Sequence, residues 1–182
     1  DASVIIPLGE GDKPSGTLCA ALEKQTWPLG KFEALIMGAD LDSRSLVVQD
    51  EHRVPGAVAM RHIRVPHTAE PDLLHRAARA ARGDCLICLG ADLLPSAHFV
   101  EAHIIAHREQ EGWGLAYGIS LPHPQLRPGK FTRWTLPGEK PAIDPTGEVS
   151  GDEAVICCGN FSLLRERYFD LGGLPGADFP TA

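Results

Sequence analysis

Two aspartates follow short apolar segments that have the composition of buried β-strands. Asp40 comes shortly after the segment 32–37, and Asp92 comes shortly after the segment 85–89. In a parallel α/β sheet, ligands bind outside the carboxyl ends of the strands, so we expect both carboxylates to face one crevice. Aspartate side chains also stabilise turns by bonding to nearby backbone amides. A turn-stabilising role is the alternative for Asp92 and the favoured interpretation for Asp40.

His103 and His107 are four residues apart within a predicted helix. At this spacing two imidazoles lie on one helix face and can grip a metal ion. The His-Glu-x-x-His motif has a glutamate directly after its first histidine, whereas this sequence has Ile104 there. We therefore interpret both histidines as structural residues of the helix.

The sequence contains five cysteines, an odd number that does not make a disulfide framework. Cys85 and Cys88 have the Cys-x-x-Cys spacing, but they lie in a predicted strand, where residues three apart point to opposite faces. We therefore predict buried structural thiols, and we predict the same for the adjacent Cys157 and Cys158. This use of cysteine is typical of a reducing compartment, which predicts a cytoplasmic location.

Apolar strand-like segments alternate with amphipathic helical ones along the chain. This alternation predicts an α/β fold, with a mostly parallel sheet and helices on both of its faces. Strands beginning near Val4, Phe32, Ile63 and Cys85 are expected to share that sheet. Further strands are predicted at 115–121 and 154–158, and a turn at Gly159-Asn160. The predicted helices cover residues 15–24, 71–83, 95–111 and 164–171, with a short one from about 42 to 49.

Residues 122–153 form a proline-rich stretch of different character. Prolines at positions 122, 124, 128, 137, 141 and 145 exclude a regular helix and most positions of a β-ladder. We predict a long excursion over the edge of the sheet, and a segment of this length without regular structure is often functional.

Five short segments occur in an order that resembles family 2 glycosyltransferases. Each segment is weak alone, but together they match the family from Ser3 to about Phe179. The resemblance implies a GT-A fold, in which a metal ion near an Asp-x-Asp motif neutralises the diphosphate of a nucleotide sugar. The segments are Ser3-Val4-Ile5-Ile6-Pro7, then Gln25-Thr26-Trp27-Pro28 ahead of Phe32-Glu33-Ala34-Leu35-Ile36, then Ala80-Ala81-Arg82-Gly83-Asp84, Leu89-Gly90-Ala91-Asp92 and Gly159-Asn160-Phe161-Ser162.

The resemblance also implies a set of site residues. Asp92 matches the last aspartate of the motif, which implies a ligand for Mn²⁺ or Mg²⁺, both of which prefer hard oxygen donors. Trp134 and Asn160 are implied on the acceptor side, with a solvated loop and a turn as their structural alternatives. The implied donor-binding residues are Pro7, Leu8, Gly9, Asp40, Ala91 and Asp92.

The sequence departs from the family's pattern in three places. Gly38 and Ala39 replace the acidic pair after the second strand, with Asp40 one position late, and Gly90 replaces the first aspartate of Asp-x-Asp. The usual Ala-Arg-Asn-x-Gly run is replaced by Leu73-Leu74-His75-Arg76-Ala77. These losses favour an alternative function, a degenerate non-catalytic domain that acts as a binding or scaffolding module.

The family's general base follows a Gly-Gly segment that ends in Asp-Phe. Here that segment is 171–179, and the sequence ends at Ala182. No base of this kind is identifiable before the sequence ends, and a general base contributes about 10²–10⁴-fold to a rate. We therefore expect little or no transferase turnover, and we interpret the sequence as a domain excised from a longer chain. Asp178 is the candidate for a substitute base.

Length and charge limit the function further. A chain of 182 residues with 43% hydrophobic residues is expected to form one compact domain with a sizeable core. The net charge of −7 argues against a nucleic-acid partner, which would need clustered Lys and Arg. No apolar run approaches the ~20 residues of a membrane span. The expected partners are a nucleoside diphosphate sugar, an acceptor that carries a hydroxyl, and further domains of a parent chain.

Overall fold

The computed structural model describes residues 1–8, 14–40, 47–52, 58–66, 70–109, 114–118 and 159–173. Within these residues the strands form one sheet in the order β3-β4-β2-β1-β5-β7-β6. The strands are β1 (Ala2–Leu8), β2 (Phe32–Asp40), β3 (Val47–His52), β4 (Ala59–Pro66), β5 (Cys85–Leu89), β6 (Ala116–Tyr117) and β7 (Asn160–Leu164). The helices are α1 (Gly16–Glu23), α2 (Glu70–Ala80), α3 (Phe99–Glu109) and α5 (Arg165–Asp170), with a 3₁₀ turn, η1 (Leu29–Lys31).

The four central strands, β4, β2, β1 and β5, run parallel to one another. Antiparallel strands extend the sheet on both sides, β3 beside β4 and β7 beside β5. The strands β1, β2 and β5 are almost continuous apolar runs, which is typical of parallel strands covered on both faces, whereas β4 carries Arg61, His62 and Arg64. The predicted mostly parallel α/β sheet with helices on both faces is confirmed, including the four strands that were expected to share it.

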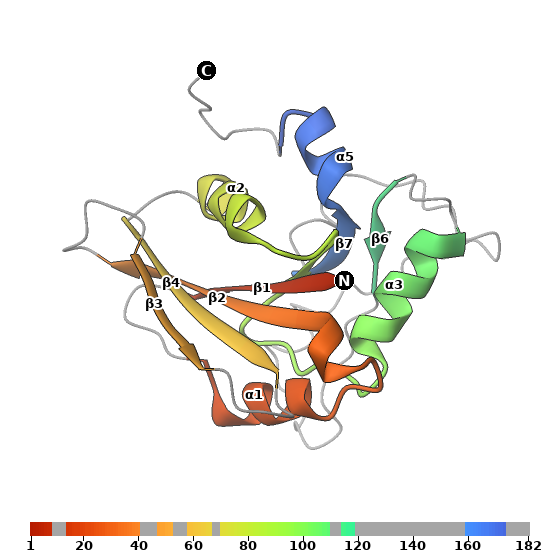
Figure 1. The fold of residues 1–182 in the computed structure, drawn as a ribbon, viewed down its shortest axis with the longest axis horizontal. Coiled ribbons are helices and arrows are strands. Elements are labelled where there is room, and N and C mark those ends of the chain that lie inside the picture. The colour runs from red at the N-terminus through yellow and green to blue at the C-terminus, as the bar shows by residue number, and fades with distance from the viewer. Residues whose placement is uncertain are drawn as a thin grey trace, which may run out of the picture.

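Two apolar clusters cover the two faces of the sheet. Val4 and Ile6 of β1 point into a cluster with α1 and α3, whereas Ile5 points into a cluster with α2 and α5. Figure 1 shows α1 on one side of the sheet and α2 with α5 on the other. Cys85 belongs to the first cluster and Cys88 to the second, and both are buried. The prediction of structural thiols on opposite faces is therefore confirmed for this pair.

Two predicted elements are wrong. Residues 47–49 were expected in a helix, but they belong to β3, which pairs antiparallel with β4. Of the predicted turn at Gly159-Asn160, Gly159 is a bend, but Asn160 begins the strand β7, which lies between β5 and β6. Pairing with a neighbouring strand decided both, and such long-range pairing overrides local propensity. The predicted strand 154–158 and the excursion 122–153 lie outside the described residues.

The first turn of α3 is tied to the end of α1 by Gln25, which belongs to the second of the family-like segments. Its Nε2 donates to the backbone carbonyls of Ala21, at 3.1 Å, and Ser96, at 2.7 Å. Its Oε1 accepts a hydrogen bond of 3.0 Å from the backbone N–H of Val100. Because Val100 is in the first turn of α3, this bond satisfies a backbone donor that the helix itself leaves unpaired. This segment therefore positions two helices.

Candidate functional site

The carboxyl ends of β1 and β2 lie side by side. Pro7 is opposite Met37, and Leu8 is opposite Gly38 in the parallel register. Asp40 ends β2 opposite Pro66 of β4, two residues beyond the position opposite Leu8. Three predicted donor-site residues thus occupy neighbouring strand ends, as their places in the sequence required.

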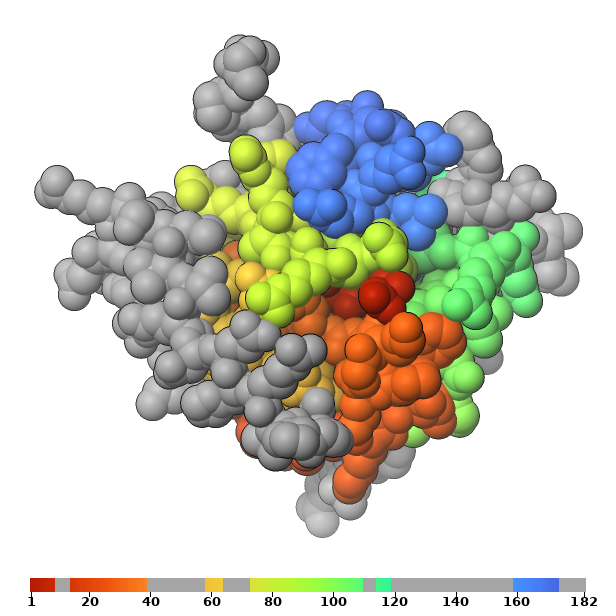
Figure 2. Space-filling model, viewed as in Figure 1, coloured from red at the N-terminus to blue at the C-terminus, as the bar shows by residue number. Residues whose placement is uncertain are grey.

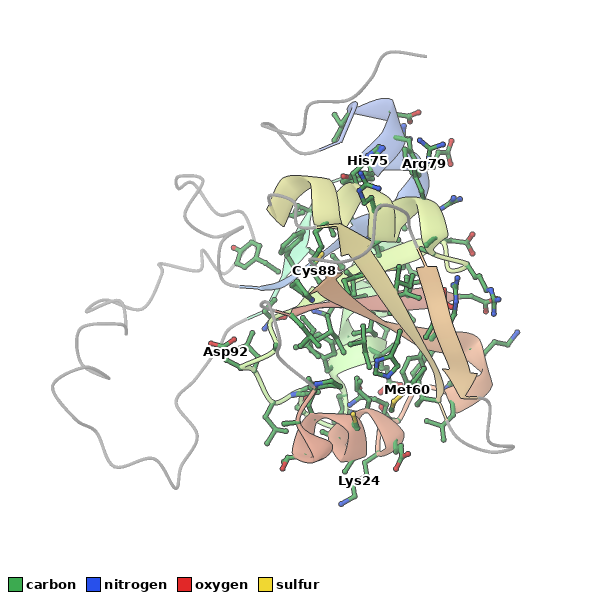
Figure 3. The ribbon with its side chains drawn as sticks, turned by 90° about the vertical axis from the view of Figure 1, so that its left-hand side faces the viewer. Lys24, Met60, His75, Arg79, Cys88 and Asp92 are labelled. Carbon is green, nitrogen blue, oxygen red and sulfur yellow. The ribbon has the colours of Figure 1, made fainter. Side chains whose placement is uncertain are left out.

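Ala91 and Asp92 form an exposed turn directly after β5, which is the neighbour of β1 on the other side. The Leu93 backbone N–H donates to the Gly90 carbonyl at 3.0 Å, which closes the turn. The Asp92 Oδ1 lies so close to Gly90 that a Cβ on Gly90 would be 2.9 Å from it. In Figure 3, Asp92 lies far from His75 and Arg79 of α2. The carboxylate of Asp92 therefore does not contact these two basic side chains (Figure 3).

The turn after β5 packs against the start of β7. The Gly90 backbone N–H donates to the Gly159 carbonyl at 2.7 Å. Gly159 has a φ of +61°, and a Cβ there would be 2.9 Å from the Gly90 Cα, so both its conformation and its surroundings favour glycine. Asn160 follows immediately and lies opposite Leu89, the last residue of β5. The structure thus brings Asn160 to the end of β5, near the predicted metal-binding turn.

Asn160 belongs to a polar network with three other side chains, which we call the Asn160 network: Asn160, His103, Ser162 and His107. The His103 Nε2 lies 3.1 Å from the Asn160 Oδ1, and its Nδ1 lies 2.8 Å from the Ser162 Oγ. The His107 Nε2 lies 2.9 Å from the same hydroxyl. Both histidines are buried on the face of α3 that meets β7. The prediction that they are structural helix residues agrees with these bonds.

Burial sets the protonation state of this network. Removal from water lowers the pKa of His103, against a hydrogen bond to Asn160 that raises it, with a smaller lowering effect from His107. Removal from water also lowers the pKa of His107. Burial raises the pKa of the Cys85 thiol to about 11, so this neighbour of Ser162 is protonated. Both imidazoles are neutral at pH 7, because their pKa values lie below the usual 6.5.

A second buried polar cluster lies at the opposite end of the sheet. The Arg61 Nη1 donates to the Glu33 Oε2 at 3.0 Å and to the Ala80 carbonyl at 2.9 Å. The other Glu33 oxygen accepts from the Ser3 hydroxyl at 2.8 Å and from the Arg82 backbone N–H at 2.7 Å. We call Ser3, Glu33, Arg61 and the backbone of 82–83 the amino-end network. It joins β1, β2, β4 and the end of α2.

Three predicted site residues lie outside the described residues. They are Gly9, Trp134 and Asp178. Sequence reasoning missed two residues near Asn160, namely Ser162 and Gly118. The signal for Ser162 was present, since residues two apart in a strand share a face and Ser162 follows Asn160 by two. Gly118 carried no such signal, because its role depends on a strand pairing between β6 and β7 that is not local.

No protein-family model matches this sequence, and no curated protein matches it. Solved structures match its fold. The mannosyltransferase PcManGT from Pyrobaculum calidifontis, solved with GDP-Man and Mn²⁺, superposes with a TM-score of 0.51 at 15% identity, covering 96% of this chain and 47% of that one. TarS 1-349 from S. aureus, solved with UDP-GlcNAc, superposes with a TM-score of 0.50 at 15% identity, covering 67% of this chain and 37% of that one.

The chain has the GT-A fold. It spans less than half the length of each of these two solved structures. The carboxyl ends of β1, β2 and β5 lie together at one edge of this GT-A sheet. Asp92 and Asn160 lie at that edge, beside the carboxyl end of β5. No helix in the described part of the chain is long and apolar enough to cross a membrane.

A divalent cation at this edge of the sheet would need several oxygen ligands. Asp92 supplies hard carboxylate oxygens, which suit Mg²⁺ or Mn²⁺. Gly90 supplies no ligand, and the described residues contain no group of three or more His, Cys, Asp or Glu side chains that could hold a metal ion. Asp92 therefore fits as one protein ligand of a cation that takes its remaining oxygens from a bound nucleotide and from water.

Proposed function

We propose that this chain binds a nucleoside diphosphate sugar at the carboxyl ends of β1, β2 and β5, and that it is a family 2-like glycosyltransferase domain that transfers the sugar to an acceptor hydroxyl. The observation that carries the proposal is the position of Asp92 on an exposed turn after β5, within a GT-A fold. PcManGT was solved with GDP-Man and Mn²⁺, and TarS with UDP-GlcNAc. Ligands of this class bind at the carboxyl ends of strands in open α/β sheets.

The donor would lie along three strand ends. The backbone of Pro7, Leu8 and Gly9 would contact the nucleobase, and Asp40 would accept hydrogen bonds from it. Asp92, beside Ala91, would hold a Mn²⁺ or Mg²⁺ ion that neutralises the charge developing on the diphosphate leaving group. The exposure of the Asp92 turn supports this assignment, because the carboxylate is accessible to a ligand.

The acceptor would lie on the β7 side of the same edge. Asn160 can hydrogen-bond a sugar hydroxyl through its amide, and Trp134 would supply an apolar surface for a sugar ring. A base must also remove the proton of the attacking hydroxyl, and Asp178 is the residue that we propose for it. The half-buried position of Asn160 at the start of β7 supports its part in this assignment.

Nucleotide binding tests the proposal. We expect calorimetry to detect binding of UDP or GDP in the presence of Mn²⁺, and we expect Asp92→Asn to weaken it about tenfold or more, which corresponds to the loss of ~1.4 kcal/mol. Asp84→Asn is the matched control, since Asp84 is an exposed aspartate that precedes β5 at the other end of the sheet. Binding that is absent in the unchanged chain, or equal in all three proteins, would contradict the proposal.

A degenerate binding or scaffolding domain is the second candidate. It is favoured by Gly90 and Gly38, which stand where the family pattern has carboxylates. The variant Gly90→Asp separates the two candidates. The atoms nearest to its Cβ would be the Asp92 Oδ1 at 2.9 Å and the Leu93 side chain at 3.4 Å, so small side-chain shifts can accommodate it. If Gly90→Asp strengthens Mn²⁺-dependent nucleotide binding, the edge is a donor site with a weakened motif; if nucleotides bind neither protein, the second candidate holds.

A further inference from the structure

The side chain of Asn160 is held by groups that the proposed reaction does not itself use. Its Oδ1 faces the His103 Nε2 at 3.1 Å, and His103 in turn contacts the Ser162 hydroxyl, which also contacts His107. Ser162 is fully buried, and the two histidines are about 95% buried. Asn160 is half-buried, at the boundary between this interior network and the strand ends. The network therefore runs from the core to the proposed acceptor side.

A hydrogen-bonded chain of this kind has two proton arrangements. In the first, His107 Nε2 donates to Ser162, Ser162 donates to His103 Nδ1, and His103 Nε2 donates to Asn160 Oδ1. In the second, the Asn160 amide is turned round so that its Nδ2 donates to His103 Nε2. His103 Nδ1 then donates to Ser162, and Ser162 donates to His107 Nε2. The two arrangements differ in which end of the side-chain amide points away from His103, the Nδ2 group in the first and the Oδ1 atom in the second.

The unpaired atom at the inner end selects between them. His107 Nδ1 is buried and has no hydrogen-bond partner in the part of the chain that the structure describes. The first arrangement leaves a bare nitrogen lone pair there, whereas the second leaves an N–H group. Buried N–H groups without a partner are rare. The first arrangement is therefore favoured, and it agrees with the position of Oδ1 beside His103.

Gly118 fixes the amide from a second side. Its backbone N–H donates to the backbone carbonyl of Asn160 at 2.9 Å, which holds the two residues together. A Cβ on Gly118 would lie 2.6 Å from the Asn160 Nδ2 and 2.7 Å from its Oδ1. The φ of Gly118 lies outside the left-handed region, so alanine could adopt this backbone, and only the contact with the amide opposes it.

We propose that His103, Ser162, His107 and Gly118 are positioning residues that turn the Asn160 Nδ2 group outward to donate a hydrogen bond to an oxygen of the bound substrate. This inference rests on the proposed function. Within the described residues, Asn160 Nδ2 has no hydrogen-bond partner, so its N–H groups are available to a ligand. The accepting oxygen belongs to the bound nucleotide sugar. It lies either on the diphosphate or on a hydroxyl of the transferred sugar, which faces the acceptor side where Asn160 lies, and both oxygens accept a hydrogen bond in the same way.

The sequence makes this proposal unusually direct to test, because Asn160 is its only asparagine. Labelling of asparagine side chains with ¹⁵N in the 182-residue chain gives one NH₂ signal pair in an NMR spectrum. We expect two well-separated proton signals, since a fixed amide holds its two N–H groups in different surroundings. We also expect ¹⁵N shifts of both histidines typical of the neutral tautomer that carries its proton on Nε2.

Four variants separate orientation from general packing. Ser162→Ala removes the central hydroxyl, and Gly118→Ala presses on the amide, so we expect both to shift the Asn160 signals and draw them together. Ser162→Thr keeps the hydroxyl and is expected to restore signals close to those of the unchanged chain. Ile104→Val is the matched control, because Ile104 is buried on α3 but belongs to the apolar cluster. Signals in Ser162→Ala and Gly118→Ala that match those of the unchanged chain, or of Ile104→Val, would overturn the orientation that we propose.

Ligands test the outward donation. UDP and GDP with Mg²⁺ shift the Asn160 signals if the acceptor is a diphosphate oxygen, whereas only UDP-GlcNAc or GDP-mannose shifts them if it is a sugar hydroxyl. We expect Ser162→Ala and Gly118→Ala to weaken the binding of that ligand about tenfold, the size of one lost hydrogen bond to a charged or fixed group, and Ile104→Val to leave it nearly unchanged.

The two proposals can fail separately. A bound nucleotide sugar that leaves the Asn160 signals unmoved overturns the outward donation while the proposed function stands. If calorimetry detects no binding of any of these ligands, the proposed function fails and the donation with it. The comparison of ligand-free variants still decides whether Ser162 and Gly118 orient Asn160.

Discussion

The two ends of the parallel sheet are built in opposite ways. At the amino end, the carboxylate of Glu33 is buried and bonded to Arg61, Ser3 and the backbone of Arg82. At the carboxyl end, the carboxylate of Asp92 is exposed on a turn next to Gly90. A closed network that uses its own hydrogen bonds stabilises a fold, whereas an accessible carboxylate can bind something else. The same carboxylate chemistry thus supports structure at one end and is accessible to a ligand at the other.

Figure 2 shows the amino end as a packed surface, where the first residues of the chain, in red, lie between the orange segment and the yellow-green segment. Gly83 belongs to this end, and a Cβ there would lie 2.3 Å from the backbone carbon of Ala2. Its N–H donates to the Ser3 hydroxyl at 2.9 Å. The segment Ala80-Ala81-Arg82-Gly83-Asp84, one of the five that carry the family resemblance, therefore has a packing role in this chain.

The largest effect is expected from the buried ion pair. Glu33→Gln leaves the buried Arg61 guanidinium without a carboxylate, and loss of one partner of such a pair costs about 3–5 kcal/mol. Urea unfolding of both proteins measures this change in the free energy of unfolding. A change below about 1 kcal/mol would show that water reaches Arg61 and that the amino end is not closed.

A matched pair of glycines compares the two ends by packing alone. Gly83→Ala is expected to lower the free energy of unfolding by about 1–3 kcal/mol or more, because the added methyl meets backbone. Gly38→Ala at the carboxyl end meets nothing within 4 Å and should change it by less than about 0.5 kcal/mol. Equal costs in the two variants, measured by thermal or urea unfolding, would contradict the contrast.

The Asn160 network predicts a pH dependence of stability. The pKa values of His103 and His107 are lowered in the folded state, so below about pH 6.5 the unfolded chain binds more protons than the folded one. Stability is therefore full above pH 6.5 and falls as the pH decreases through the folded pKa values, by at most about 1.4 kcal/mol per pH unit for each histidine. Unfolding midpoints between pH 8 and pH 5 measure the slope, and His103→Gln should reduce it. Midpoints that rise toward low pH would refute the neutral network.

The smallest effect on stability is expected at the turn after β5. Asp92→Asn should change the free energy of unfolding by less than about 0.5 kcal/mol, because the side chain is exposed and no hydrogen bond within the described residues holds it. Urea unfolding checks this. A loss above about 1 kcal/mol would assign Asp92 to turn stabilisation, the structural alternative that its sequence context also allowed.

The sheet could be predicted from sequence where the signal was local. The apolar runs of β1, β2 and β5 predicted strands correctly, and the positions of Asp40 at the end of β2 and Asp92 after β5 followed directly. β3 and β7 were missed because their strand conformation depends on pairing with neighbouring strands. β3 pairs with β4, and β7 pairs with β5 and β6. The Asn160 network depends on the same unpredicted pairing, so His103 and His107 were recognised as structural while their partners were not.

One measurement tests the central claim most directly, that nucleotide and metal bind beside Asp92 and Asn160. Mn²⁺ is paramagnetic and broadens the NMR signals of nearby nuclei, and Asn160 supplies the one asparagine side-chain signal of the chain. We predict that Mn²⁺ with UDP or GDP broadens this signal strongly, that Mn²⁺ alone does so much less, and that Asp92→Ala abolishes the nucleotide-dependent part while Asp84→Ala retains it. Alanine is used at both positions so that Asn160 stays the one asparagine. An Asn160 signal that stays sharp with Mn²⁺ and both nucleotides, or that broadens equally in Asp92→Ala, would contradict the account.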